Sequence, residues 1–151
     1  MSRANLFLDS SALFAGVASP VGAARALILL AEADLITITI SDQVITETEH
    51  AVARKIPQAL PFYRQALQRA GLHIQHAPSQ EEIQAHRHII SHQADVPIIV
   101  AAMKAKVDYL VTLNRRHFID DPEVATRSGL RIGTPGDALA WEREQLASSS
   151  D

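Results

Sequence analysis

The stretch NLFLDSSALFAG, residues 5–16, predicts a strand that runs directly into a helix. Three consecutive apolar residues, Leu6, Phe7 and Leu8, are typical of a short strand that is buried on both faces. The apolar run stops at Asp9, and two small polar residues lead into a helix-compatible segment. A strand followed at once by a helix is the first half of a βαβ unit.

The segments that follow continue this alternation. Apolar residues spaced by three and four predict a helix over about residues 21–33, and the β-branched run LITITI predicts a strand over 35–40. Further helices are expected over residues 41–56, 57–71, 79–93, 95–107 and 134–145, and strands over 72–76, 109–113 and 130–133. Because parallel strands need a crossover helix, we expect a three-layer α/β/α sandwich with a central parallel sheet.

Composition limits the size and the setting of this domain. The 151 residues are 47% hydrophobic and 21% charged, which fits one domain over residues 1–147 with a disordered tail over 148–151. No apolar run reaches the length of a membrane helix, and the start does not resemble a signal peptide. Without cysteine there are no disulfides, so we expect a reducing cytoplasm. The net charge of -3 argues against a surface built entirely for phosphate.

Carboxylates stand where a parallel sheet places its ligand site, at the carboxyl ends of strands and at helix starts. Asp9 ends the first strand, where it is either a helix cap or a functional acid, and Asp95 has the same two interpretations at its helix start. Glu47 and Glu49 lie at opposite borders of one apolar helix face, so periodicity does not choose between them. Carboxylate ligands favour hard cations such as Mg²⁺ or Mn²⁺.

The turn TLNRRHF, residues 112–118, is the second polar strand end. It is either an ordinary asparagine turn with exposed bases or a site that orients a metal-bound water, with Arg115 and Arg116 available for phosphate. Glycine-rich phosphate loops and a GxSxG nucleophile turn are absent from the sequence. His88 and His92 share a face of the predicted helix over 79–93, and we interpret them as a polar helix face.

Together these segments resemble the PIN domain family, in particular the small VapC-like ribonuclease toxins. The likeness covers nearly the whole chain, and ADVPIIVAAMKAKVDYLVTLNRRHF, residues 94–118, is its most specific stretch. The resemblance implies a PIN-like, Rossmann-related sandwich. It also implies three family acids, a small hydroxyl residue after the first of them, a hydroxyl in the last core strand and a fourth acidic position. In this order they map to Asp9, Glu47 and Asp95, then to Ser10, Thr112 and Asn114.

Asn114 departs from the aspartate that many PIN domains carry there, although a branch with TLNRRHF and a later IGTPGDAL resembles this chain. An amide holds a divalent cation less strongly than a carboxylate does, and Asp120 and Asp121 lie just downstream as possible substitutes.

The resemblance implies a metal-dependent ribonuclease that is the toxin of a toxin–antitoxin pair, with an antitoxin partner and a homodimeric state. Mg²⁺ or Mn²⁺ is expected on Asp9, Glu47 and Asp95, with Asn114 positioning the water. Contacts to RNA are expected from Ser10, Thr112, Arg115, Arg116 and His117. One alternative is a catalytically weakened PIN-like module that binds RNA or protein. A metal-dependent phosphatase of the haloacid dehalogenase type is a weaker alternative, because it needs an aspartate where Ser11 stands.

Overall fold

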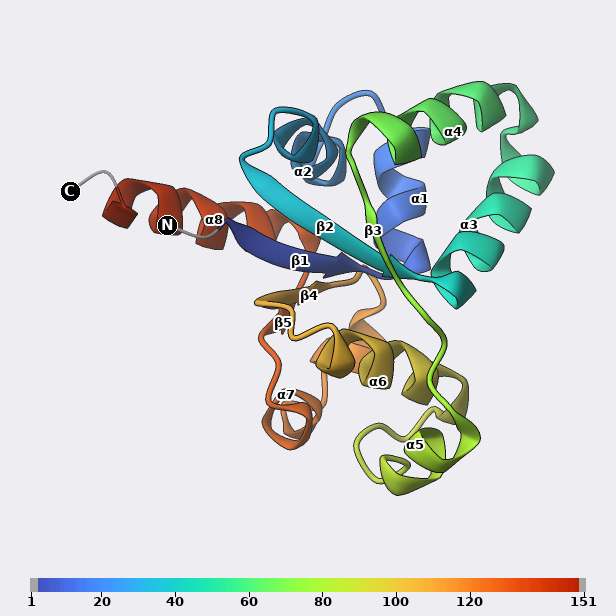
Figure 1. Ribbon diagram of the computed structural model, residues 1–151, viewed down its shortest axis with the longest axis vertical. Helices are drawn as coiled ribbons and strands as arrows, with labels where there is room; N and C mark the ends of the chain where they lie inside the picture. The colour runs from blue at the N-terminus through green and yellow to red at the C-terminus, as the bar shows by residue number, and fades with distance from the viewer. Residues whose placement is uncertain (1–2, 150–151) are drawn as a thin grey trace.

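Five parallel strands form one sheet in the computed structural model, which describes residues 3–149 (Figure 1). The strand order is β3-β2-β1-β4-β5, and all four neighbouring pairs are parallel. The strands are β1 (Ala4–Leu8), β2 (Ile36–Ser41), β3 (His73–Gln75), β4 (Tyr109–Val111) and β5 (Ile132–Gly133). The first strand of the chain therefore lies at the centre of the sheet.

Helices cover both faces of this sheet, which confirms the predicted three-layer sandwich. Figure 1 shows α1 to α4 on one side of the strands and α5 to α7 on the other, while α8 packs against α2. The helices are α1 (Ser10–Ala18), α2 (Ala23–Glu32), α3 (Asp42–Lys55), α4 (Leu60–Arg69), α5 (Gln80–Ala85), α6 (Val96–Lys104), α7 (Glu123–Ser128) and α8 (Pro135–Ser149). Short helical turns add η1 (Pro57–Ala59), η2 (Gln93–Asp95) and η3 (Arg115–Ile119).

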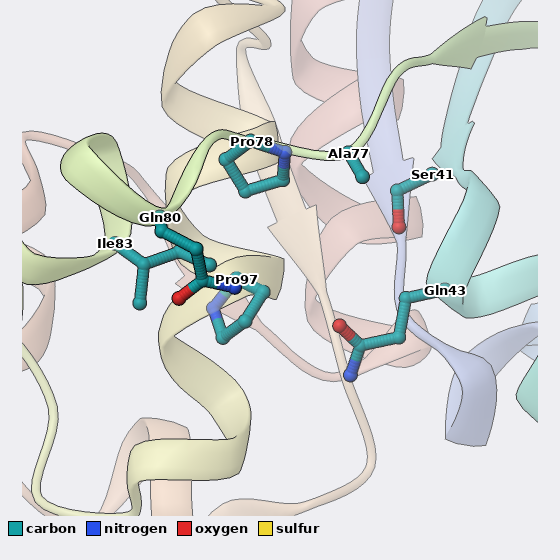
Figure 2. Close-up of a pocket in the computed structure, with 7 residues that line it drawn as sticks. All are labelled: Ser41, Gln43, Ala77, Pro78, Gln80, Ile83 and Pro97. Carbon is teal, nitrogen blue, oxygen red and sulfur yellow. The ribbon is translucent and has the colours of Figure 1, made fainter.

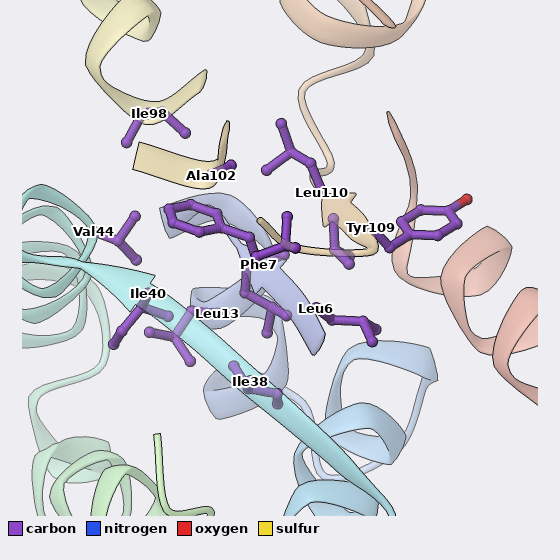
Figure 3. Packing of buried hydrophobic residues seen from close by; sticks show 14 of the residues in the cluster. Leu6, Phe7, Leu13, Ile38, Ile40, Val44, Ile98, Ala102, Tyr109 and Leu110 are labelled. Atoms are coloured by element: carbon purple, nitrogen blue, oxygen red, sulfur yellow. The ribbon is translucent and has the colours of Figure 1, made fainter. Parts of the chain in front are cut away.

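The apolar core has β1 at its middle. Leu6, Phe7 and Leu8 are fully buried, because helices pack on both faces of the strand. Figure 3 shows Phe7 beside Leu110 of β4 and Ala102 of α6. Burial on both faces explains why this strand is continuously apolar rather than alternating.

The predicted helix over residues 79–93 is wrong in its second half, since α5 ends at Ala85. Ser79 and Glu82 form the expected capping box at its start. Beyond the helix, the neighbouring Ile89 and Ile90 are both buried, which the chain achieves by leaving the helical path. The Gln93 side chain then binds the main-chain oxygens of Arg87, Ser91 and Ile90. These contacts hold a compact turn where the polar pattern predicts a helix.

Two further elements differ from the expectation. The short helix α7 is not predicted from the sequence, and it ends at Gly129, whose φ of 72° is left-handed and suits glycine. The last helix, α8, runs through Ser149 and so includes two residues of the predicted disordered tail. Residues 150–151 of that tail lie outside the described part of the chain.

No single helix within residues 3–149 has the length and apolar composition to cross a membrane. Only α1 and α2 taken together meet these two criteria, and they are joined by a bend of 89°.

Glu142 of α8 is a buried acid at a distance from the sheet's carboxyl edge. It is 2% exposed, and its Oε2 has no hydrogen-bond partner in the described structure. Burial, and then the negative charge of Asp108, raises the pKa of Glu142 above its usual 4.5. Since the folded state holds this proton more tightly, the group's contribution to stability is lost as pH rises through the raised pKa.

Glu142→Gln is therefore expected to increase the free energy of unfolding at pH 8 by about 1 kcal/mol. The gain should shrink toward zero below pH 4.5, where both forms of the side chain are neutral. Urea unfolding at several pH values measures this difference. The matched control is Glu144→Gln on the exposed side of the same helix, which should change stability little at any pH. An equal effect of both substitutions would contradict the assignment.

Candidate metal centre

Asp9 is both a helix cap and a buried acid at the carboxyl end of β1. Its Oδ1 accepts hydrogen bonds from the Ala12 amide at 3.0 Å and from the Ser11 hydroxyl at 2.7 Å, while Oδ2 accepts one from the Thr112 hydroxyl. Burial raises the pKa of Asp9, these three hydrogen bonds oppose the rise, and the charge of Asp95 adds to it. With 6% of the residue exposed, Asp9 is held rigidly at the sheet edge.

The side-chain hydroxyl of α1 that donates to Asp9 belongs to Ser11, the residue after Ser10, and the contact of Ser10 with RNA stays a prediction. Ser11 Oγ donates to Asp9 and accepts the Leu113 amide hydrogen at 3.0 Å, which ties the start of α1 to the end of β4. Ser10 makes no hydrogen bond with Asp9 in the described structure. The signal that could have found Ser11 is its position two residues after a capping aspartate, where a short side chain turns back toward the cap.

Thr112 is fully buried, and its contact with RNA stays a prediction. Its hydroxyl donates to Asp9 and accepts the Asn114 amide hydrogen at 2.9 Å. The residue positions Asp9 from the neighbouring strand.

Glu47 and Glu49 of α3 have different surroundings, which periodicity does not reveal. Glu49 forms an ion pair with Arg64 at 3.8 Å. Glu47 receives a hydrogen bond from Gln43. Partial burial is the largest cause that raises the pKa of Glu47, and the charges of Asp95 and Asp9 raise it further. Glu47 therefore lies within electrostatic reach of both Asp9 and Asp95.

Asp95 precedes α6 but does not cap it. Its side chain makes no capping hydrogen bond, and its backbone is helical (φ -93°, ψ -9°) as the last residue of η2, not extended as in a usual N-cap. The carboxylate instead lies 2.7 Å from Nδ1 of His117. Asp95 is thus free of the helix and faces the turn after β4.

The turn after β4 is a π-helical turn, η3, and Asn114 caps it. Asn114 Oδ1 accepts the main-chain N–H of His117 at 3.2 Å, and its Nδ2 lies 2.9 Å from Nδ1 of the same residue. Both ends of the amide therefore contact His117. The ring of His117 stacks on the ring of His92, with 4.0 Å between centroids.

His92, Asp95 and His117 form a group that could hold a metal ion, with ligand atoms within 4.8 Å of one another. The interpretation of His88 and His92 as one polar helix face is wrong, because the helix ends before either residue. The sequence pattern does not predict the contact between His92 and His117, because it joins segments that are 25 residues apart along the chain.

Of the remaining predicted residues, Arg115, Arg116 and Asp120 are exposed and Asp121 is half-buried. Arg115 and Arg116 lie at the surface of η3, and Arg115 is within electrostatic reach of Asp137. Asp121 accepts the Glu123 amide hydrogen and lies 3.9 Å from Arg127, so it does not substitute for an acid at position 114. Asp120 is exposed at the end of η3.

A parallel sheet of order 3-2-1-4-5 that gathers carboxylates at its carboxyl edge defines a class of α/β domains with a candidate metal centre. A family model described as PIN domain matches residues 5–116, about three quarters of the chain. The chain belongs to the PIN domain family, whose members are typically metal-dependent nucleases. A comparison with curated proteins finds no match to the chain.

Proposed function

We propose that this chain is a metal-dependent ribonuclease that hydrolyses phosphodiester bonds of RNA. The observation that carries the proposal is the electrostatic coupling of Asp9, Glu47 and Asp95 at one edge of a PIN domain sheet. The charge of Asp95 raises the pKa of Asp9, and the charges of Asp95 and Asp9 raise the pKa of Glu47, so ionising this group of carboxylates is unfavourable without a cation. Their oxygen atoms are the ligands that Mg²⁺ and Mn²⁺ prefer.

Asp9, Glu47 and Asp95 would hold the ion. When bound, a divalent cation activates a water molecule and neutralises charge on the phosphate in the transition state. Ser11 and Thr112 orient the Asp9 carboxylate from two sides, so its oxygens are fixed before the ion binds. The imidazoles of His92 and His117 lie beside Asp95 and favour Mn²⁺ among the hard cations.

Residues of η3 serve the substrate side of this centre. Arg115 and Arg116 are exposed cations that contact RNA phosphates, and His117 lies next to Asp95, where an RNA phosphate on the ion would come close. Asn114 acts as a positioning residue in this proposal, because both ends of its amide contact His117.

We assign the nuclease to a toxin–antitoxin pair that acts in the cytoplasm. Support comes from the resemblance of residues 112–118 and 132–139 to the VapC-like branch. The proposal includes an antitoxin protein that covers the metal centre, and it includes a homodimeric state of the toxin. A small gene for a DNA-binding antitoxin immediately upstream would support it, and an isolated gene would contradict it.

The wild-type protein tests the function directly. Single-stranded RNA should be cleaved with Mn²⁺ or Mg²⁺, cleavage should stop when EDTA removes the metal, and it should resume when Mn²⁺ is restored in excess. Cleavage that persists in EDTA would contradict the proposal. RNA binding without cleavage at any metal concentration would favour the second candidate, a weakened binding module, for which Asn114 at the fourth acidic position is the supporting observation.

A further inference from the structure

A pocket of about 260 Å³ lies at the carboxyl ends of β2 and β3, beside the metal centre (Figure 2). Ser41 and Gln43 line it from the β2–α3 junction, Pro78 and Gln80 from the start of α5, and Pro97 from α6. Within residues 3–149, no lysine, arginine or acid lines the pocket. Its volume is somewhat below the range of about 300–1,000 Å³ for sites that bind drug-sized molecules.

Hydrogen bonds hold the walls of this pocket in place. Asp42 Oδ2 accepts the main-chain N–H of Ala77 at 3.2 Å, which fastens the segment after β3 to the start of α3. The capping box of Ser79 and Glu82 fixes α5. Gln43 Nε2 donates to the Ala94 oxygen at 3.4 Å, which bridges to the opposite wall. The pocket is therefore preformed by three elements that are distant in sequence.

The lining offers neutral hydrogen-bonding groups between flat apolar walls. Ser41 is 2% exposed, and its Oγ accepts the Val44 amide hydrogen. Its hydroxyl hydrogen has no acceptor within the described residues, so it is available to a ligand. Gln80 makes no side-chain hydrogen bond there either, and an amide offers both a donor and an acceptor. Figure 2 shows Gln80 beside Pro97, with Gln43 on the opposite side.

These features select the chemistry of the occupant. The absence of basic residues disfavours a phosphate, which is recognised by positive charge and convergent N–H groups. A flat, neutral heterocycle with donors and acceptors on its edge matches two proline rings, an amide and a hydroxyl. Among the parts of an RNA chain, only the base has this character.

The pocket stands next to the metal centre. Gln43 hydrogen-bonds Glu47, and Pro97 follows Asp95 by two residues. Ser41 ends β2, the strand adjacent to β1 and Asp9, and neighbouring strands lie about 4.8 Å apart. A phosphate at the centre and the base of an adjacent nucleotide in the pocket are therefore compatible with one RNA strand.

We infer that this pocket binds one unpaired RNA base next to the cleaved phosphate and so sets the base preference of the nuclease. The inference rests on the proposed ribonuclease function for its biological meaning. Unpaired bases present their hydrogen-bonding edges, whereas bases in a duplex do not. Gln80 is the specificity residue of the pocket.

The test is a binding experiment on the full chain that needs neither metal nor cleavage. Each of the four ribonucleoside 5′-monophosphates is titrated into ¹⁵N-labelled protein in EDTA, with ribose 5-phosphate as the probe that lacks a base. At least one nucleotide should shift the amide signals of Ala77, Gln80 and Ile83, and ribose 5-phosphate should not. Gln80→Ala should lower the affinity for that nucleotide by about threefold to tenfold, which is the effect of losing one neutral hydrogen bond. The matched control is Gln68→Ala on the exposed face of α4, which should bind like wild type.

Equal shifts with ribose 5-phosphate, shifts confined to other parts of the protein, or unchanged binding by Gln80→Ala would each overturn the inference. The result separates this inference from the proposed function. Nucleotide binding at the pocket in a protein that cleaves no RNA would support the base-binding site and contradict the proposed ribonuclease function. Metal-dependent cleavage with the same base preference in wild type and Gln80→Ala would support the ribonuclease function and contradict the base-binding site.

Discussion

Glu47→Gln is expected to slow RNA hydrolysis by about a thousandfold, because one ligand of a catalytic ion contributes several kcal/mol to the transition state. The substitution keeps the size of the side chain and its ability to accept the hydrogen bond from Gln43. It also removes one charge from a cluster of like charges, so the folded protein should be at least as stable. Single-turnover cleavage of a labelled RNA with saturating Mn²⁺ measures the rate.

Glu49→Gln is the matched control for this prediction. It makes the same chemical change two residues away on the same helix, where the carboxylate pairs with Arg64 and has no part in the cluster. Because that pair is exposed, its loss should cost no more than about 1 kcal/mol, and cleavage should stay within about twofold of wild type. Similar rates for the two variants would show that α3 contributes no ligand.

Asp9→Asn is expected to have opposite effects on cleavage and on stability. Cleavage should fall by about a thousandfold or more, because the buried carboxylate is lost from the centre. Asparagine caps a helix as well as aspartate does, so α1 keeps its start. Without metal at pH 8, removing a buried charge next to Asp95 should raise Tm by about 2–4 °C, as about 1 kcal/mol does in a domain of this size.

The raised pKa of Asp9 explains why Asp9→Asn should be the more stable protein at high pH. Burial raises the pKa of Asp9 above 3.8, so the folded state binds the proton more tightly than the unfolded state. The stability of the metal-free wild type therefore falls as pH rises through the raised pKa, and Asp9→Asn lacks this fall. Below pH 3.8, where the Asp9 side chain is neutral in both the folded and the unfolded state, the stability difference between wild type and Asp9→Asn that comes from this charge should disappear. A Tm advantage of Asp9→Asn that persists undiminished at low pH would contradict the explanation by charge.

Bound metal is expected to make wild type more stable than Asp9→Asn, the reverse of the order without metal. Mn²⁺ at about a hundred times its dissociation constant should stabilise wild type by about 2.7 kcal/mol, whereas the variant should gain little. Thermal scans with and without Mn²⁺ therefore distinguish a site that binds metal from a buried acid with only a structural role.

The architecture was predictable because its signals are local. The apolar run before Asp9 and the alternation of strands with helices predict a parallel sheet, and β1 lies at its centre. The strand-end rule likewise directs attention to Asp9 and Asn114. These inferences need only the residue order and the geometry of one crossover unit.

The parts that failed depend on contacts between distant segments. His92 joins the site only because the predicted helix stops at Ala85, and Gln93 then binds the main chain of the turn. The ring of His117 that stacks on His92 comes from the turn after β4. Pattern reasoning within one window does not reveal such an encounter.

Two ambiguities of the sequence have physical resolutions. Asp9 is at once the cap and a member of the charge cluster, since its two oxygens have different partners. Asp95 is not a cap, because its backbone already belongs to the helical turn η2, which the sequence pattern does not predict. The choice of Glu47 over Glu49 came from the family resemblance, and the structure adds different electrostatic surroundings for the two acids.

Calorimetric titration of Mn²⁺ into the metal-free protein tests the proposed centre most directly. Wild type and Glu49→Gln are expected to bind Mn²⁺ with the same affinity, and Glu47→Gln, Asp9→Asn and Asp95→Asn at least about tenfold more weakly. Absence of Mn²⁺ binding by wild type, or equal affinity in all five proteins, would contradict the assignment of Asp9, Glu47 and Asp95 as the metal centre.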